Sequence, residues 1–254
     1  MEQPFQLDQF IIHHITDSSQ WHLPFGVVHL PEPLTIQKLM VILTGILMIW
    51  IFCFVYRKQD RVPKGFTNFL EVFILHIRND LAIEFLGEED GKRLTPLFLT
   101  FFFFILFLNV LGLIPIFPTT ATANVFTTGA LAFITFTLMT AGGMAKHGVL
   151  NYMKLFILPG VPKPILLLLT PLEVLSLFIR AGALTVRLFA NMFAGHIVIL
   201  SILGLVVTLG LVALPAIAMA LFVYVLEVFV AFLQAYIFTF LSAIFIGQIY
   251  HPQH

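Results

Sequence analysis

No charged residue occurs from Leu94 to Ala145, and apolar side chains dominate this stretch. Because an α-helix rises about 1.5 Å per residue, about 20 apolar residues cross the hydrocarbon core of a bilayer. The stretch is long enough for two crossings, and Pro115, Pro118 and the polar segment 119–124 predict the turn between them. With 59% hydrophobic and only 10% charged residues in the whole chain, a soluble domain is excluded.

Unbroken apolar runs favour helices over the strands of a transmembrane barrel, in which polar and apolar residues alternate. We predict an all-α polytopic membrane protein with about five membrane-inserted helices and an amphipathic helix on the cytoplasmic surface. The net charge is zero and no basic block occurs, so no nucleic-acid partner is expected. The single cysteine, Cys53, lies in an apolar run and cannot form an internal disulfide.

The predicted organisation is an N-terminal tail followed by one membrane domain over residues 34–254. Residues 1–33 are expected to be a solvated, partly ordered tail, with metal binding by its histidines as the alternative. Those histidines are His13, His14, His22 and His29. The membrane domain is predicted to contain a first span over about 34–56, an amphipathic helix over about 66–87, spans over about 94–116 and 125–145, and a long hairpin over about 165–249.

Basic residues immediately after the first span predict the orientation. They are Arg57, Lys58, Arg61 and Lys64. Since loops rich in lysine and arginine stay in the cytoplasm, that end is expected inside and the N-terminus outside. With about five membrane-inserted helices after an outer N-terminus, the C-terminus is expected in the cytoplasm.

The chain after Ile165 carries only four formal charges, all in apolar surroundings. They are Glu173, Arg180, Arg187 and Glu227. An arginine keeps its charge in protein and costs about 2.5 to 3.5 kcal/mol at the bilayer centre on insertion scales, so a functional role is its default interpretation.

The sequence Thr170-Pro171-Leu172-Glu173 has the pattern of a helix start. No further proline occurs before Pro215, so the predicted helix is about twice the length of one crossing. A second over-long helix follows. The two predict a strongly tilted antiparallel hairpin that turns near Gly210.

In such a hairpin one register places Arg187 beside Gln234, and Glu173 beside Gln248, with His196 and Glu227 at nearly equal depth. His196 follows Arg187 by about 900° of helical rotation and so faces the opposite side, whereas a residue four positions on stays near the arginine's side. That residue is Asn191. We therefore expect Arg187 to face a partner protein and the His196/Glu227 pair to face an aqueous path.

The segment RLFANMFAGH, which runs from Arg187 to His196, resembles subunit a of the F-type ATP synthase. Glu227 and the sequence LQA around Gln234 stand at the family's spacing downstream. The segments from Asn109 to Pro115 and from Pro171 to Glu173 resemble two further family motifs, and the similarity covers about residues 94–249. The resemblance implies a proton-channel stator that faces a rotating c-ring in a hetero-oligomeric complex, held by subunit b of the peripheral stalk.

By that resemblance Arg187 is the essential arginine and Gln234 its neighbour. Asn191, His196 and Glu227 would line an outer half-channel, and Glu173, Arg180 and Gln248 an inner one. Many bacterial members carry an acid at the position of His196 and a histidine at that of Glu227, whereas mitochondrial-type members have them exchanged, as here. Bacterial or organellar origin stays open, with the extended tail favouring a bacterial inner membrane.

Several residues also have purely structural interpretations. Glu173 could serve as a helix cap, Arg180 could extend to the interface, and His196 with Glu227 could be a static pair. We expect Asn109 to pack, with a hydrogen bond across helices as the alternative. We expect His251 and His254 to belong to a solvated tail. A secondary transporter or an ion channel with an intramembrane Arg/Glu/His site is the alternative function, although no internal repeat is apparent. No active site, cofactor or metal is predicted, and the coupling ion, H⁺ or Na⁺, stays open.

Overall fold

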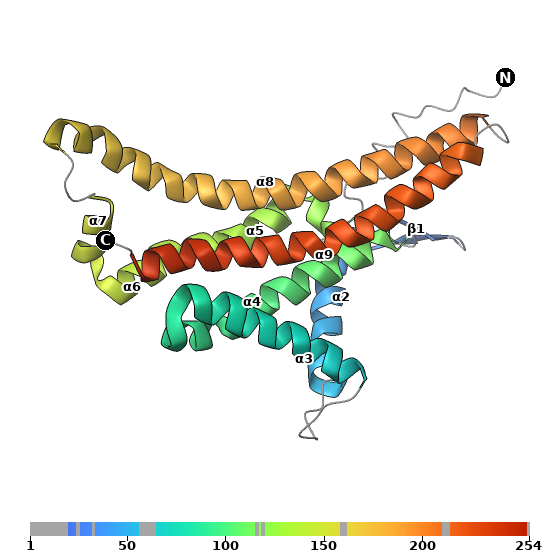
Figure 1. Cartoon of the computed structure of the whole chain (residues 1–254). Helices are drawn as coiled ribbons and strands as arrows, with labels where there is room; N and C mark the ends of the chain where they lie inside the picture. The colour runs from blue at the N-terminus through green and yellow to red at the C-terminus, as the bar shows by residue number, and fades with distance from the viewer. Residues whose placement is uncertain are drawn as a thin grey trace. The chain divides into compact units, whose positions relative to one another are not determined.

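The computed structural model describes residues 20–23, 26–31, 34–55, 65–114, 117, 120–157, 162–209 and 214–252. Its strands are β1 (Gln20–Leu23) and β2 (Gly26–His29). Its helices are α2 (Ile36–Trp50), α3 (Phe66–His76), α4 (Glu84–Leu113), α5 (Val125–Thr137), α6 (Gly143–His147), α7 (Val149–Leu155), α8 (Lys163–Leu209) and α9 (Leu214–Tyr250), as Figure 1 shows. Shorter π and 3-10 segments are η1 (Ile51–Val55), η2 (Ile77–Ile83), η3 (Ala121–Ala123) and η4 (Leu138–Gly142).

Five helices in the described part of the chain are long and apolar enough to cross a membrane. They cover Ile36–Phe54, Phe66–Leu113, Val125–His147, Pro164–Val206 and Pro215–Tyr250. The predicted all-α polytopic class is therefore confirmed. Some sequence predictions concern residues outside the described ranges: the basic cluster Arg57, Lys58, Arg61 and Lys64, the turn residues Pro115, Pro118 and Gly210, and the histidines His13, His14 and His254.

The amphipathic segment formed by α3 and η2 continues into α4 until Gly87, where the backbone leaves the helical conformation. Gly87 has φ 75° and ψ 175°, a combination that essentially only glycine adopts. The break falls at the end of the predicted amphipathic helix. It separates this segment from the rest of α4, which begins with the charged stretch 88–93 and is apolar from Leu94 onward.

The chain divides into two compact units. Unit 1 comprises residues 1–53, 103–125 and 188–235, and unit 2 comprises residues 54–102, 126–187 and 236–254. Both α8 and α9 are continuous helices that contribute one portion to each unit.

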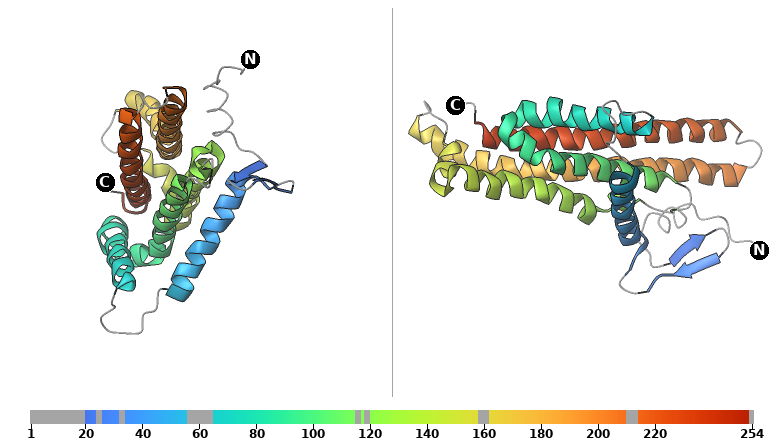
Figure 2. Two further views of the ribbon diagram at one scale, coloured as in Figure 1. Left: turned by 90° about the vertical axis from the view of Figure 1, so that its right-hand side faces the viewer. Right: turned by 90° about the horizontal axis from the view of Figure 1, so that it is seen from below.

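The core of unit 1 lies where α2 meets the second half of α4 and the η3 turn. Ile36, Met40, Leu108 and Ala121 are fully buried there. The strands β1 and β2 pair antiparallel, Gln20 opposite His29 and Leu23 opposite Gly26, an element that the tail prediction did not contain. Figure 2 shows the strands at the end of α2 where that helix begins.

Unit 2 joins α3, η2, the first half of α4, α5 to α7 and one portion each of α8 and α9. Buried hydroxyls bridge α5 and α9, because Thr135 Oγ1 and Ser242 Oγ lie 3.1 Å apart. Close packing brings Gly247 of α9 against the start of α4, where an added Cβ would stand 2.5 Å from the Phe85 carbonyl oxygen.

The predicted start of the first hairpin helix at Thr170 is wrong. α8 begins at Lys163 and contains Pro171 in its interior. Pro164 occupies the first turn instead, where a missing N–H costs nothing because that donor has no intrahelical partner. The capping-box pattern therefore does not explain Glu173, which lies within the helix.

Candidate functional site

Arg187 is exposed on α8, and no described residue forms a hydrogen bond or an ion pair with its guanidinium. Ala183 lies four residues before it and Ala190 three residues after it, and both are exposed. Residues at these spacings share one side of a helix. The guanidinium thus stands on a face of small side chains that a neighbouring helix could approach closely.

The two hairpin helices leave most of their apolar surface exposed. Only 11% of the most apolar segment of α8 and 17% of that of α9 are buried, against 50% in the helix that contains α4. In a bilayer such surfaces face lipid or another apolar helix.

Unit 1 brings Glu227 of α9 against Gly195 of α8, directly beside His196 in the sequence. An added Cβ at Gly195 would overlap Glu227 Oε1 and stand 2.8 Å from its Cδ. Only a residue without a side chain leaves this space to the carboxylate. The contact agrees within one residue with the register that the sequence predicts for the hairpin, whose arms lie side by side near the turn (Figures 1 and 2).

His196 and Glu227 do not bond to each other. Glu227 is 8% exposed, and neither of its carboxylate oxygens finds a hydrogen-bond partner among the described residues. The same holds for His196 Nε2 and for the amide nitrogen of Gln234, a residue that is 5% exposed. Burying unpaired polar groups is costly, so each such group calls for an explanation, such as a bound water molecule, an ion or a functional role.

Asn191 is partly buried on α8, and no described residue forms a hydrogen bond with its side chain. Arg187 belongs to unit 2 and Gln234 to unit 1, so their pairing stays a prediction. Asn109 does more than pack: it accepts a hydrogen bond from Thr122 Oγ1 at 2.8 Å and donates to the Ala231 carbonyl oxygen at 3.4 Å.

Unit 2 brings the three predicted inner residues together. Arg180 Nη1 donates to Gln248 Oε1 at 2.7 Å, and Arg180 Nη2 lies 3.8 Å from Glu173 Oε1. The guanidinium also covers the Phe245 ring at 5.5 Å. Glu173 and Arg180 are seven residues apart in α8 and therefore lie on the same side of that helix. Gln248 belongs to α9.

These three side chains line a cavity of about 830 Å³. The other lining residues are Glu84, Phe85, Gly87, Leu155, Phe156, Ile244, Gly247, Ile249, His251 and Pro252. The walls thus combine carboxylates, a guanidinium, an amide and an imidazole. Such a wall can hold water and exchange protons with it.

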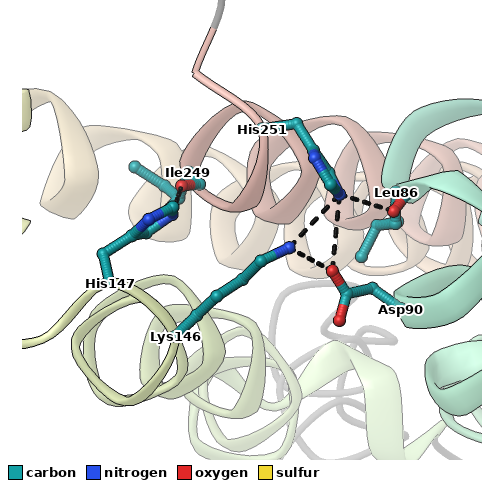
Figure 3. A network of polar contacts seen from close by, with 6 residues as sticks. All are labelled: Leu86, Asp90, Lys146, His147, Ile249 and His251. Atoms are coloured by element: carbon teal, nitrogen blue, oxygen red, sulfur yellow. Dashed lines mark hydrogen bonds and ion pairs between the residues drawn. The ribbon is translucent and has the colours of Figure 1, made fainter.

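A second polar cluster, joined to this cavity through His251, was missed by sequence reasoning. Figure 3 shows Lys146 of α6 bonded to Asp90 of α4, with His251, which follows α9, beside both. His251 Nε2 lies 2.7 Å from the Leu86 carbonyl oxygen, so the prediction of a solvated tail at His251 is wrong. No local pattern indicates this contact, because its members come from three distant parts of the chain.

Comparison with known proteins identifies the family. A family model of the ATP synthase A chain matches residues 38–247. ATP synthase subunit a of Anaeromyxobacter dehalogenans is 46% identical over 230 residues, which are 89% of this chain and 59% of that protein. ATP synthase subunit a of Chloroherpeton thalassium is 41% identical over 270 residues, which are 99% of this chain and 79% of that protein.

ATP synthase subunit a of Myxococcus xanthus is 40% identical over 259 residues, 92% of this chain and 85% of that protein. The chain spans less than two thirds of the A. dehalogenans relative and more than two thirds of the other two. The matched range includes Arg187, His196, Glu227 and Gln234. On the family match and these identities, the chain belongs to the ATP synthase A chain family.

Proposed function

We propose that this chain is the proton-conducting stator of a rotary ATP synthase. Two half-channels open on opposite sides of the membrane and each leads to a carboxylate on a c-ring, with Arg187 between them. The observation that carries the proposal is Arg187 itself: it is exposed on a helix face of small residues, it has no hydrogen-bond or ion-pair partner among the described residues, and it lies in a chain of this family. The partners are the c-ring and subunit b, and the membrane is most simply a bacterial inner membrane with the N-terminus outside.

The outer half-channel uses Asn191, His196 and Glu227. Histidine and carboxylate have ordinary pKa values near 6.5 and 4.3, so both exchange protons near neutrality. The unpaired Glu227 oxygens and His196 Nε2 are free to bind a passing proton or the water that carries it. The proton then neutralises a ring carboxylate, which can rotate into lipid because it no longer carries charge.

The inner half-channel uses the cavity lined by Glu173, Arg180 and Gln248. A protonated ring carboxylate that approaches Arg187 is driven to ionise, since an adjacent cation favours the charged form. The released proton leaves through the cavity. Each charge that crosses 100 mV supplies about 2.3 kcal/mol for rotation, and the fixed guanidinium stops protons from passing directly between the half-channels.

The test is ATP-driven proton pumping by the intact complex in membrane vesicles. Arg187→Ala is expected to abolish pumping, and Arg187→Lys to recover little, because a guanidinium and an ammonium differ in shape and hydration. Arg78→Ala, which removes an exposed arginine in η2, is the matched control and should pump normally. Normal pumping by Arg187→Ala would refute the stator function.

The outer path has its own test. The exchanged variant His196→Glu/Glu227→His keeps one imidazole and one carboxylate at the same two positions. It is expected to pump better than His196→Ala, because proton exchange needs the pair of groups more than their order. Equal failure of the two variants, with intact assembly, would show that the positions and not the chemistry are required.

A further inference from the structure

His251 lies at the wall of the unit 2 cavity, in a position that depends on the break at Gly87. The break ends the helical hydrogen bonding around Leu86 and leaves a carbonyl that needs a donor. His251 Nε2 approaches that carbonyl to 2.7 Å, and an added Cβ at Gly87 would stand 3.7 Å from the same nitrogen. The imidazole is therefore seated against the break.

The contacts of Nε2 decide where the proton of the imidazole is. A carbonyl oxygen only accepts, so Nε2 carries hydrogen and donates to Leu86, with Asp90 Oδ2 3.4 Å away as a second acceptor. The Lys146 ammonium, 3.3 Å from Nε2, only donates and cannot bond to that nitrogen in this state. The second ring nitrogen, Nδ1, is then the atom that gains and loses a proton.

Nδ1 of His251 has no hydrogen-bond partner among the described residues, and half of the side chain is exposed, 51%. The same residue lines the cavity that Glu173 and Arg180 line. One imidazole thus meets the cavity and the exterior. Histidine is the side chain that ordinarily exchanges protons between pH 5 and 8.

The charges around the ring are of both signs. The titratable and charged side chains from the elements packed at this site are Glu84, Asp90 and Arg93 of α4, Lys146 and His147 of α6, Glu173 and Arg180 of α8, and Tyr250 of α9. Asp90 and Lys146 pair with each other, so their charges largely offset at the imidazole.

We propose that His251 is the proton-exchange residue at the mouth of the inner half-channel. A proton leaving the cavity binds Nδ1 and gives the imidazolium, whose second N–H stays on Leu86. Nδ1 then releases the same proton to buffer outside, and the steps reverse when the complex pumps. The proposal rests on the proposed function of the cavity as the inner half-channel.

The test compares His251→Gln with wild type in proton flux through the intact complex at low buffer concentration. The glutamine amide can still donate to Leu86 but does not titrate, so the variant should lose most of the flux. Added imidazole should restore the flux in His251→Gln and leave wild type unchanged, because a mobile base replaces the missing one. A purely structural role of His251 would not respond to imidazole.

His147→Gln is the matched control. His147 Nε2 makes a similar contact with a backbone carbonyl, that of Ile249 at 3.0 Å, but does not line the cavity. The His147→Gln variant should keep the proton flux of wild type, and added imidazole should not change that flux. Normal flux in His251→Gln at low buffer, or loss of flux without rescue, overturns the proposal.

If His251→Gln lowers recovery of the intact complex, Asp90→Asn is the second variant. It keeps the imidazole and its bond to Leu86 but removes the carboxylate that lies 3.4 Å from Nε2, so the pH dependence of the flux should change. An unmoved profile overturns the role of His251. Pumping by Arg187→Ala separates the two proposals, since normal pumping there refutes the channel itself, whatever His251 does.

Discussion

Replacing Gly195 by alanine tests whether the position of the Glu227 carboxylate matters. The new Cβ would stand 2.8 Å from Glu227 Cδ and overlap Oε1. Carbon atoms in contact are about 3.5 to 4.0 Å apart, so Cδ must retreat by about 0.7 Å or more. The clashing atoms end a flexible side chain, and the carboxylate therefore moves before the helices separate.

The expected result is loss of transport with retained assembly. Alanine is better than glycine in a helix interior by about 1 kcal/mol, and overpacking costs about 1 to 3 kcal/mol, so stability changes little. Misplacing a reacting group by about 1 Å can cost up to about 100-fold in rate, and we expect a loss of about tenfold or more in ATP-driven pumping.

Gly182→Ala is the matched control on the same helix, because nothing lies within 4 Å of its added Cβ. It should pump normally. In the background Glu227→Asp, whose carboxylate is one methylene shorter, Gly195→Ala should cause a smaller further loss, since contacting residues are energetically coupled. Two results would refute a displaced carboxylate as the cause. One is wild-type pumping by Gly195→Ala, and the other is the same fold loss from Gly195→Ala in wild type and in Glu227→Asp.

Three further predictions concern stability, measured as the temperature at which the solubilised complex loses this chain. Asn109→Ala removes the oxygen that accepts the hydrogen bond from Thr122 Oγ1. Losing the partner of a buried donor costs about 1 to 3 kcal/mol. We expect about 1 kcal/mol here, because Thr120 Oγ1 lies 3.0 Å from the same hydroxyl and can accept its hydrogen. Gly87→Ala forces alanine to φ 75° and should lower the stability by about 1 to 3 kcal/mol. The control Gly45→Ala in α2, whose added Cβ has no atom within 4 Å, should be neutral or stabilising. Equal effects of the two substitutions would contradict backbone strain at Gly87. Tyr224→Phe removes the donor to the Leu113 carbonyl oxygen at 2.9 Å, at the end of α4, and should cost about 1 kcal/mol; an unchanged temperature would mean that solvent replaces the bond.

Much of the fold follows from hydropathy and helix periodicity. Apolar runs of membrane length identify the crossing helices, and the charges of the segment around Glu71 and Arg78 separate an amphipathic helix from them. Spacing by seven places Glu173 and Arg180 on one stripe, and the antiparallel register brings Gln248 near them. These inferences succeed because they depend on residues close in sequence or on one antiparallel pairing of two helices.

The capping-box pattern at Thr170 predicted the start of α8 wrongly. Local capping signals at Thr170 compete with an earlier proline, Pro164, and in this chain the helix continues through Pro171. Neighbours in the folded chain, and not the local pattern alone, set where a helix ends. The strands β1 and β2 likewise form from residues that the composition assigned to a tail.

The sequence by itself determined the membrane class, the two over-long helices and Arg187 as a charge within an apolar, membrane-length segment. Only the tertiary structure decided that Glu227 rests against Gly195, that Asn109 bridges Thr122 and α9, and that Asp90 and Lys146 meet His251. Periodicity assigns a residue to a face of its own helix. Which distant side chain meets that face depends on close packing of the whole unit, which no local pattern records.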